Sequence, residues 1–232
     1  MENQCSPKSL RIFELVLVTG IAFAATIFIS IYSLFSGDFT NAARTGQVPV
    51  FYGLIYELLA LAVLCYVLFR QGRTLRQVGL TFSWKDIPVS ILLCVIAYVA
   101  FCVCYIAIHY GYYYVAGRML IPPNQPQTYL NAGVTIGTVV FILINPIYEE
   151  LIVRAYTISE VTFLTGSSVV AVAASVILQV SYHLYQGIPA AIALGAGFLV
   201  LSIYFVRYGR IAPVILAHLY FDALAFLAYA KS

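Results

Sequence analysis

Long apolar stretches follow one another along almost the whole chain, with only short polar connections between them. A stretch of about 20 apolar residues is what an α-helix needs to cross the hydrocarbon core of a bilayer. The strict alternation of apolar and polar residues typical of a membrane β-barrel is missing from the sequence. Hydrophobic residues make up 62% of the chain, far above the roughly 45 to 50% of a soluble domain. We therefore expect an all-α fold, a polytopic transmembrane helical bundle of about seven spans, at residues 12–34, 48–69, 87–108, 134–157, 167–182, 188–206 and 211–230.

The distribution of Lys and Arg predicts the orientation of this bundle, because the cytoplasmic loops of membrane proteins carry an excess of both. With the N-terminus in the cytoplasm, three of the 12 basic residues fall on the far side, namely Arg44, Arg118 and Lys231. The net charge of +3 is too small to indicate a nucleic-acid partner. We expect a multi-pass protein of the plasma membrane with a cytoplasmic N-terminus and these basic residues on the cytoplasmic side: Lys8, Arg11, Arg70, Arg73, Arg76, Lys85, Arg154, Arg207 and Arg210.

The chain divides into three parts on this interpretation. Residues 1–11 form a polar cytoplasmic N-terminus, and residues 12–133 contain the first three membrane helices with their loops. Residues 134–230 form a core of four helices that holds most of the ionisable residues of the apolar stretches. The main cytoplasmic loop is expected at residues 70–86, and the main external loop at the Tyr-rich residues 111–131.

Two adjacent carboxylates, Glu149 and Glu150, lie in the fourth apolar stretch just after Pro146. Ionisable groups at membrane depth are costly unless they are paired or hydrated, so they mark functional sites by default. On a helix, Glu150 and Arg154 are four residues apart and share a face, whereas Glu149 is rotated away by about 100°. We expect Glu150 to pair with Arg154 and Glu149 to border a hydrated pocket, where it would act as a general base on water. A plain interfacial charge cluster at a helix end is the alternative.

Two histidines follow on later spans. His183 lies near the end of the fifth apolar stretch, and His218 and Asp222 lie one helical turn apart on the last one. Asp222 could fix the imidazole tautomer or supply an oxygen ligand. The alternatives are an interfacial packing role for His183 and an ordinary interhelical hydrogen bond for the other pair. For both imidazoles to reach the depth of Glu149, the sixth span must be short, tilted or partly re-entrant.

Taken in order, these residues resemble the three motifs of the CPBP intramembrane protease family, which includes type II CAAX prenyl proteases and bacteriocin-processing and immunity proteins. Glu149, Glu150 and Arg154 match the first motif, and the last span matches the third motif, His-x-x-x-Asp. The second motif departs, because the family prefers Phe four residues before its histidine and this chain has Gln179 there. The likeness covers about residues 134–227 and identifies residues 134–230 as a CPBP-like protease core.

The resemblance implies a role for each matched residue. Glu149 is similar to the water-activating carboxylate, with His183 assisting it. The remaining catalytic pair, His218 and Asp222, is similar to the one that shapes an oxyanion site or, in the metalloprotease interpretation, binds metal. Glu150 and Arg154 would support the site by holding the helix and tuning the local charge.

The residues leave the metal question open. His183, His218 and Glu149 could bind Zn²⁺ with one open position, but the compact His-Glu-x-x-His signature of zinc proteases is absent. A glutamate can also work without a metal, as base and then as acid on one bound water. We favour metal-free hydrolysis. The expected partners are the lipid bilayer and a membrane-associated peptide or protein substrate, prenylated or carrying another apolar C-terminal tail.

Two other functions are compatible with the sequence. In a non-enzymatic immunity factor or scaffold, the same charges would only hold the bundle together. A proton-coupled transporter also places Glu and His residues inside the membrane, and Glu57 in the second span keeps this option open. A hydrogen bond from Glu57 to a neighbouring helix is the simpler expectation, and seven spans without an inverted half argue against a transporter.

Overall fold

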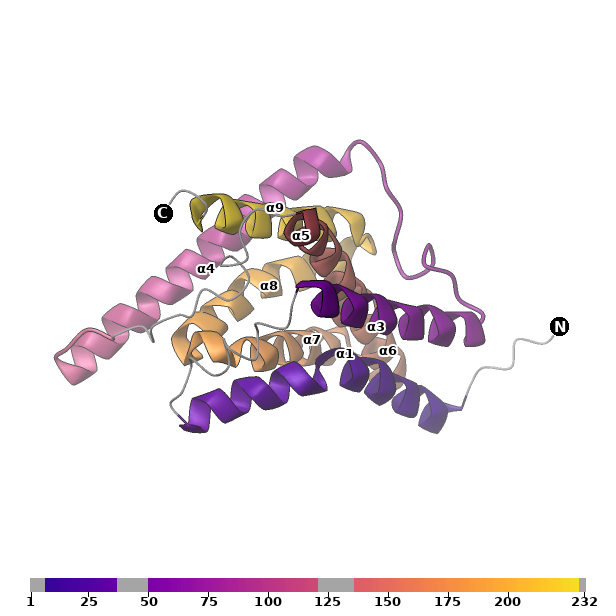
Figure 1. Ribbon diagram of the computed structural model, residues 1–232, viewed down its shortest axis with the longest axis horizontal. Helices are drawn as coiled ribbons and strands as arrows, with labels where there is room; N and C mark the ends of the chain where they lie inside the picture. The colour runs from indigo at the N-terminus through magenta and orange to yellow at the C-terminus, as the bar shows by residue number, and fades with distance from the viewer. Residues whose placement is uncertain (1–6, 37–49, 121–135, 230–232) are drawn as a thin grey trace.

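The computed structural model describes residues 7–36, 50–120 and 136–229, and in these residues every regular element is helical. The predicted all-α fold is confirmed (Figure 1). Seven helices follow one another in the described residues, and the fourth is built from three consecutive segments. Their bounds are α1 Lys8–Ser36, α3 Val50–Arg70, α4 Asp86–Ala116, α5 Ile136–Glu149 continuing through a π-helical segment Glu150–Tyr156 into α6 Thr157–Thr165, α7 Ser168–His183, α8 Ile188–Tyr208 and α9 Ala212–Tyr229.

Length and composition make this a multi-pass membrane protein. Among the described residues, six helices are long and apolar enough to cross a bilayer, and the seventh is a shorter apolar helix, Ala212–Leu227. Large apolar side chains such as Phe28, Phe35 and Phe69 point outward. A helix that is apolar on its outer face as well as its inner face is typical of a membrane span. The outward apolar side chains therefore face lipid.

The third span is longer than the sequence predicted. Helix α4 continues to Ala116, so residues 111–116 belong to a helix rather than to the expected external loop. The helix ends at Gly117, whose φ of 66° places it in the left-handed region and whose N–H bonds to the Tyr113 carbonyl at 2.9 Å. Glycine adopts this C-terminal cap without steric cost. The tyrosines within residues 111–116 are part of the helix and do not end it. Residues 121–131 of the predicted loop lie outside the described residues.

The fourth helix carries the two adjacent glutamates in an irregular region. Pro146 lies inside α5, and the π-helical segment begins at Glu150 and contains Arg154. Proline removes one backbone donor from a helix, and π-helical turns are frequent at functional sites. The helix continues to Thr165, which places Arg154 in mid-helix, and the Arg154 side chain is fully buried. A buried arginine in mid-helix carries little information on topology, so the orientation prediction depends on the other basic residues.

Several of those other basic residues gather at one end of the bundle through ion pairs. These pairs join the start of α1, the loop after α3, the end of α6 and the turn between α8 and α9. The backbone adds a further link, because Ile211 N–H donates to the Gly79 carbonyl at 3.0 Å. The segments predicted to share the cytoplasmic side thus lie together, through the pairs Arg11–Glu160, Arg73–Glu160, Arg70–Glu14 and Arg210–Asp86.

Helix α8 runs obliquely between α7 and α9, with α4 packed along it (Figure 1). Two glycines allow its close approach to neighbouring helices. A Cβ atom added at Gly195 would lie 2.7 Å from Val180 Cγ2, and one added at Gly197 would lie 3.1 Å from the Ala97 carbonyl oxygen. Small residues at such positions let membrane helices approach closely. This packing places the middle of α8 against the residues described next.

Candidate active site

Glu149 is the last residue of α5 and is buried against α7. Its Oε2 atom accepts two hydrogen bonds from α7, one from the Tyr182 hydroxyl at 2.6 Å and one from Gln179 Nε2 at 2.9 Å. Both bonds fall on the same oxygen, and among the described residues Oε1 accepts none. The carboxylate is thus held in one orientation with one oxygen left for another partner.

His183 is the last residue of α7, one helical turn after Gln179. Its Nε2 lies 3.1 Å from Gln179 Nε2, and its Nδ1 lies 3.2 Å from Gln186 Nε2 in the 3₁₀ turn Leu184–Gln186. Residues i and i+4 share one face of a helix, so Gln179 reaches Glu149 and His183 together. The structure therefore brings His183 to the side of Glu149.

Glu150 and Arg154 form the predicted ion pair, with Arg154 Nε 3.2 Å from Glu150 Oε2 and both side chains fully buried. The guanidinium also donates from Nη1 to Gln179 Oε1 at 2.5 Å and lies over the Phe198 ring, 4.4 Å from its centroid. A desolvated cation over an aromatic face gains about 2 kcal/mol. Arg154 therefore connects the π-helical segment to both α7 and α8.

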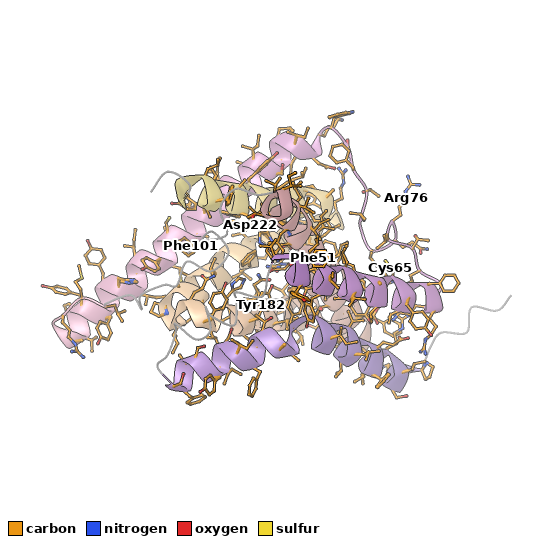
Figure 2. All side chains as sticks on the ribbon, viewed as in Figure 1. Phe51, Cys65, Arg76, Phe101, Tyr182 and Asp222 are labelled. Atoms are coloured by element: carbon orange, nitrogen blue, oxygen red, sulfur yellow. The ribbon has the colours of Figure 1, made fainter. Side chains whose placement is uncertain are left out.

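The structure gives His218 a closer partner than the Asp222 carboxylate. Its Nδ1 lies 2.7 Å from Glu150 Oε1, whereas Nε2 lies 3.6 Å from Asp222 Oδ1, beyond hydrogen-bonding distance. An ionised carboxylate only accepts hydrogen bonds, so Nδ1 is the nitrogen that donates to Glu150. Glu150 thus fixes the orientation of the imidazole, which is the role expected of Asp222. Figure 2 shows Asp222 and Tyr182 within the bundle and the exposed Arg76 on the outer loop.

Phe198 of α8 lies between the two imidazoles. Its ring stacks on His183 with centroids 6.2 Å apart and meets His218 edge-on at 5.1 Å. Both imidazoles interact electrostatically with the Glu149 carboxylate. The difference in depth suggested by the sequence is overcome by tilt, because α8 is a full-length helix that runs obliquely between α7 and α9.

Three residues of this cluster were missed from the sequence. Gln179 was taken as the loss of a packing residue, yet it is fully buried and contacts three polar groups. Its position four residues before His183 could have indicated that the two side chains share one face of the helix. Tyr182 adjoins that histidine in the sequence, but nothing local indicated that its hydroxyl would reach another helix. Phe198 lies in an apolar run with no distinguishing feature.

The donor set does not fit a preformed zinc site. Among the described residues, no three His, Cys, Asp or Glu side chains are placed to share a metal ion. The groups that the sequence offered as ligands are directed at protein partners instead. Glu149 binds Tyr182 and Gln179, and His218 binds Glu150. No step proposed below passes through a metal.

Glu57 lies next to this cluster but comes from α3. Its Oε1 accepts a hydrogen bond from Asn145 Nδ2 of α5 at 2.8 Å, which is the simpler role expected for it. Within the described part of the chain, Oε2 has no hydrogen-bond partner. Glu57 also interacts electrostatically with Glu149 and Asp222. The second span therefore supplies one wall of the cluster.

Comparison with known proteins supports the resemblance seen in the motifs. Residues 131–224 match the family described as type II CAAX prenyl endopeptidase Rce1-like, a segment that contains all six residues singled out from the sequence. Neither a curated protein nor a solved structure matches the chain. The chain therefore carries, at residues 131–224, a domain of the Rce1-like type II CAAX prenyl endopeptidase family, a family of intramembrane proteases.

Proposed function

We propose that this protein is an intramembrane endopeptidase that hydrolyses a peptide bond of a membrane-associated substrate with water activated by Glu149. The observation that carries the proposal is the state of the Glu149 carboxylate. Two donors hold Oε2, and Oε1 is left without a partner among the described residues. A candidate general base must be placed to reach the proton that it abstracts, and Oε1 is the atom so placed.

The proposed reaction uses this geometry. Glu149 Oε1 takes a proton from water while the water oxygen attacks the carbonyl carbon of the scissile bond. The carbon–nitrogen bond then breaks, and the proton held by Glu149 passes to the leaving amine, so the carboxylate is regenerated. The hydroxyl of the water ends on the new carboxyl group and its proton on the new amine. One glutamate thus acts as base and then as acid.

The other residues of the cluster support this step. His183 lies beside Glu149 and assists it in activating the water. With Nδ1 donating to Glu150 at 2.7 Å, His218 can donate from Nε2 as well only as an imidazolium, and this Nε2–H, on the Asp222 side, would face the carbonyl oxygen of the substrate. Donors aimed at the oxygen where negative charge develops lower the barrier of acyl transfer. Glu150 and Arg154 hold the helix that carries the base.

The substrate that suits this site has a lipidated or apolar C-terminal tail. The site lies inside a bundle whose outer surface is apolar, so a substrate reaches it from the bilayer or its edge. The family of the matched domain acts on CAAX-type prenylated proteins, and a prenyl group is one such tail. We place the protein in the plasma membrane with its N-terminus in the cytoplasm.

The test is cleavage by purified protein in lipid vesicles, with a farnesylated CAAX peptide and the same peptide without its farnesyl group. Glu149→Gln keeps the shape of the side chain and its acceptor oxygen but removes the base. We expect the cleavage rate to fall by about 10² to 10⁴, the contribution that general acid–base catalysis makes to the rate.

Glu14→Gln is the matched control, because Glu14 is a buried carboxylate that pairs with Arg70 away from the site. We expect this variant to retain most of the activity. Folded Glu149→Gln protein that cleaves at the wild-type rate would contradict the mechanism. Absence of cleavage of either peptide, and of any membrane protein of the host, by the wild type would favour the immunity or scaffold alternative.

A further inference from the structure

The Gln179 side chain has only one orientation compatible with its neighbours. Arg154 Nη1 lies 2.5 Å from the oxygen of the amide, and Glu149 Oε2 lies 2.9 Å from its nitrogen. A guanidinium can only donate hydrogen bonds, so the amide oxygen must face Arg154. The amide nitrogen then faces Glu149, which accepts.

The same nitrogen has a second hydrogen, and that hydrogen faces His183. Gln179 Nε2 and His183 Nε2 are 3.1 Å apart. Since the amide nitrogen only donates, the ring nitrogen must accept, and an accepting ring nitrogen carries no proton. The proton of the neutral imidazole is therefore on Nδ1. The group that faces Nδ1 is the side-chain amide of Gln186, whose Nε2 lies 3.2 Å away. Because an amide nitrogen only donates, Nδ1–H requires this amide to be turned by about 180°, so that its oxygen accepts from the ring.

We propose that Gln179 is a positioning residue that aligns Glu149 and holds His183 as the neutral Nδ1–H tautomer. Its effect on catalysis rests on the function proposed above. With its Nε2 lone pair occupied by Gln179, His183 cannot take the proton of water through that atom. Glu149 is left as the base of the site, and His183 acts only as a donor through Nδ1–H.

Gln179 also matters for the structure, because it binds the buried guanidinium of Arg154. Among the described residues, Arg154 Nε and Nη2 have no hydrogen-bond partner, although Nε faces Glu150 in the ion pair. The Gln179 oxygen therefore accepts the one hydrogen bond that the buried guanidinium makes there. Phe, which the CPBP family prefers at this position, could fill the space but would provide neither the acceptor for Arg154 nor the donors for Glu149 and His183.

Nitrogen NMR of protein labelled with ¹⁵N only in histidine tests the tautomer directly. The chain has three histidines, so the spectrum is small, and the His183 signals are identified by their loss in His183→Gln. We expect Nδ1 of His183 to be protonated and Nε2 to be unprotonated in the wild-type protein. A protonated Nε2 would overturn the inference, and this measurement needs neither activity nor a Gln179 variant.

Gln179→Met removes the amide at nearly constant volume, and Gln71→Met is its matched control. Gln71 also binds a buried carboxylate, Glu14, at 2.9 Å, but this carboxylate belongs to the ion pairs at one end of the bundle. We expect Gln179→Met to populate the Nε2–H form of His183 and to lower kcat about tenfold to hundredfold with KM within about twofold, the effect of losing one hydrogen bond to a charged group. Gln71→Met should change neither.

The outcomes separate the two proposals. An unchanged kcat in Gln179→Met, with the tautomer altered, would contradict the positioning role while leaving Glu149 as the base. A wild-type protein that shows the Nδ1–H tautomer but cleaves no substrate would contradict the proposed function while leaving the assignment of His183 intact.

Discussion

Arg154 is the residue whose removal most directly tests the packing of the site. It pairs with Glu150 at 3.2 Å, donates to Gln179 at 2.5 Å and lies 4.4 Å from the centroid of the Phe198 ring, all in the interior of the bundle. Met is close to Arg in length but carries no charge. Arg154→Met therefore leaves the Glu150 carboxylate buried without its cation and the Gln179 oxygen without its donor.

The expected loss of stability is large. Removing one partner of a buried ion pair costs about 3 to 5 kcal/mol, because the other charge stays buried and uncompensated. Glu150 keeps His218 at 2.7 Å, so we expect the lower end of this range, about 3 kcal/mol. Neutralising the remaining partner should reverse much of the loss. For the double variant Arg154→Met/Glu150→Gln, we expect to recover about 2 kcal/mol, since the new amide oxygen can still accept from His218.

The assay is reversible unfolding in mixed detergent micelles, which reports the free energy of unfolding of each variant. Arg207→Met is the control, because Arg207 is exposed at the end of α8, and it should stay within about 0.5 kcal/mol of the wild type. An Arg154→Met protein as stable as this control would refute the reasoning. So would a double variant no more stable than Arg154→Met alone.

Two further predictions concern metal and backbone conformation. A chelator such as 1,10-phenanthroline should leave cleavage unchanged, because the candidate ligands already bind protein groups; activity lost to the chelator and restored by Zn²⁺ would show a metal-dependent route. Gly79→Ala should lower the free energy of unfolding by about 2 kcal/mol or more, since Gly79 has a φ of 97° and an added Cβ would lie 2.5 Å from the Gly209 carbonyl oxygen. Gly72→Ala, with a φ of 68° and open space around it, should show only the backbone strain of about 1 to 2 kcal/mol, and equal losses in the two variants would disprove the predicted clash.

Much of the fold could be predicted because membrane spans are encoded locally. The length of each apolar run decides whether a helix can cross the bilayer, and this property needs no knowledge of its neighbours. The same locality explains the pairing of Glu150 with Arg154 at 3.2 Å, since residues four apart share a helical face whatever surrounds them. Helix ends were less predictable. The end of α4 at Ala116 depends on the conformation of Gly117, and the tyrosines before it suggested a loop.

The sequence predicted which residues belong to the candidate site better than it predicted which of them are in contact. The order of Glu149, His183 and His218 on three separate spans predicted the chemistry, but not which groups would touch. The contact of Glu150 with His218 joins residues 68 positions apart, and that of Tyr182 with Glu149 joins residues 33 apart. Such contacts depend on helix rotation and tilt.

The sequence by itself determined that the chain forms apolar helices and that a small set of ionisable residues must find partners inside them. Only the tertiary structure decided which partners these are. The oblique course of α8 brings Phe198 between the two imidazoles, and the rotation of α7 points Gln179 at both Glu149 and Arg154. The physical reason is that a buried polar group must be satisfied by whichever neighbour packing brings within reach, and the packing of helices is a property of the whole bundle rather than of any one segment.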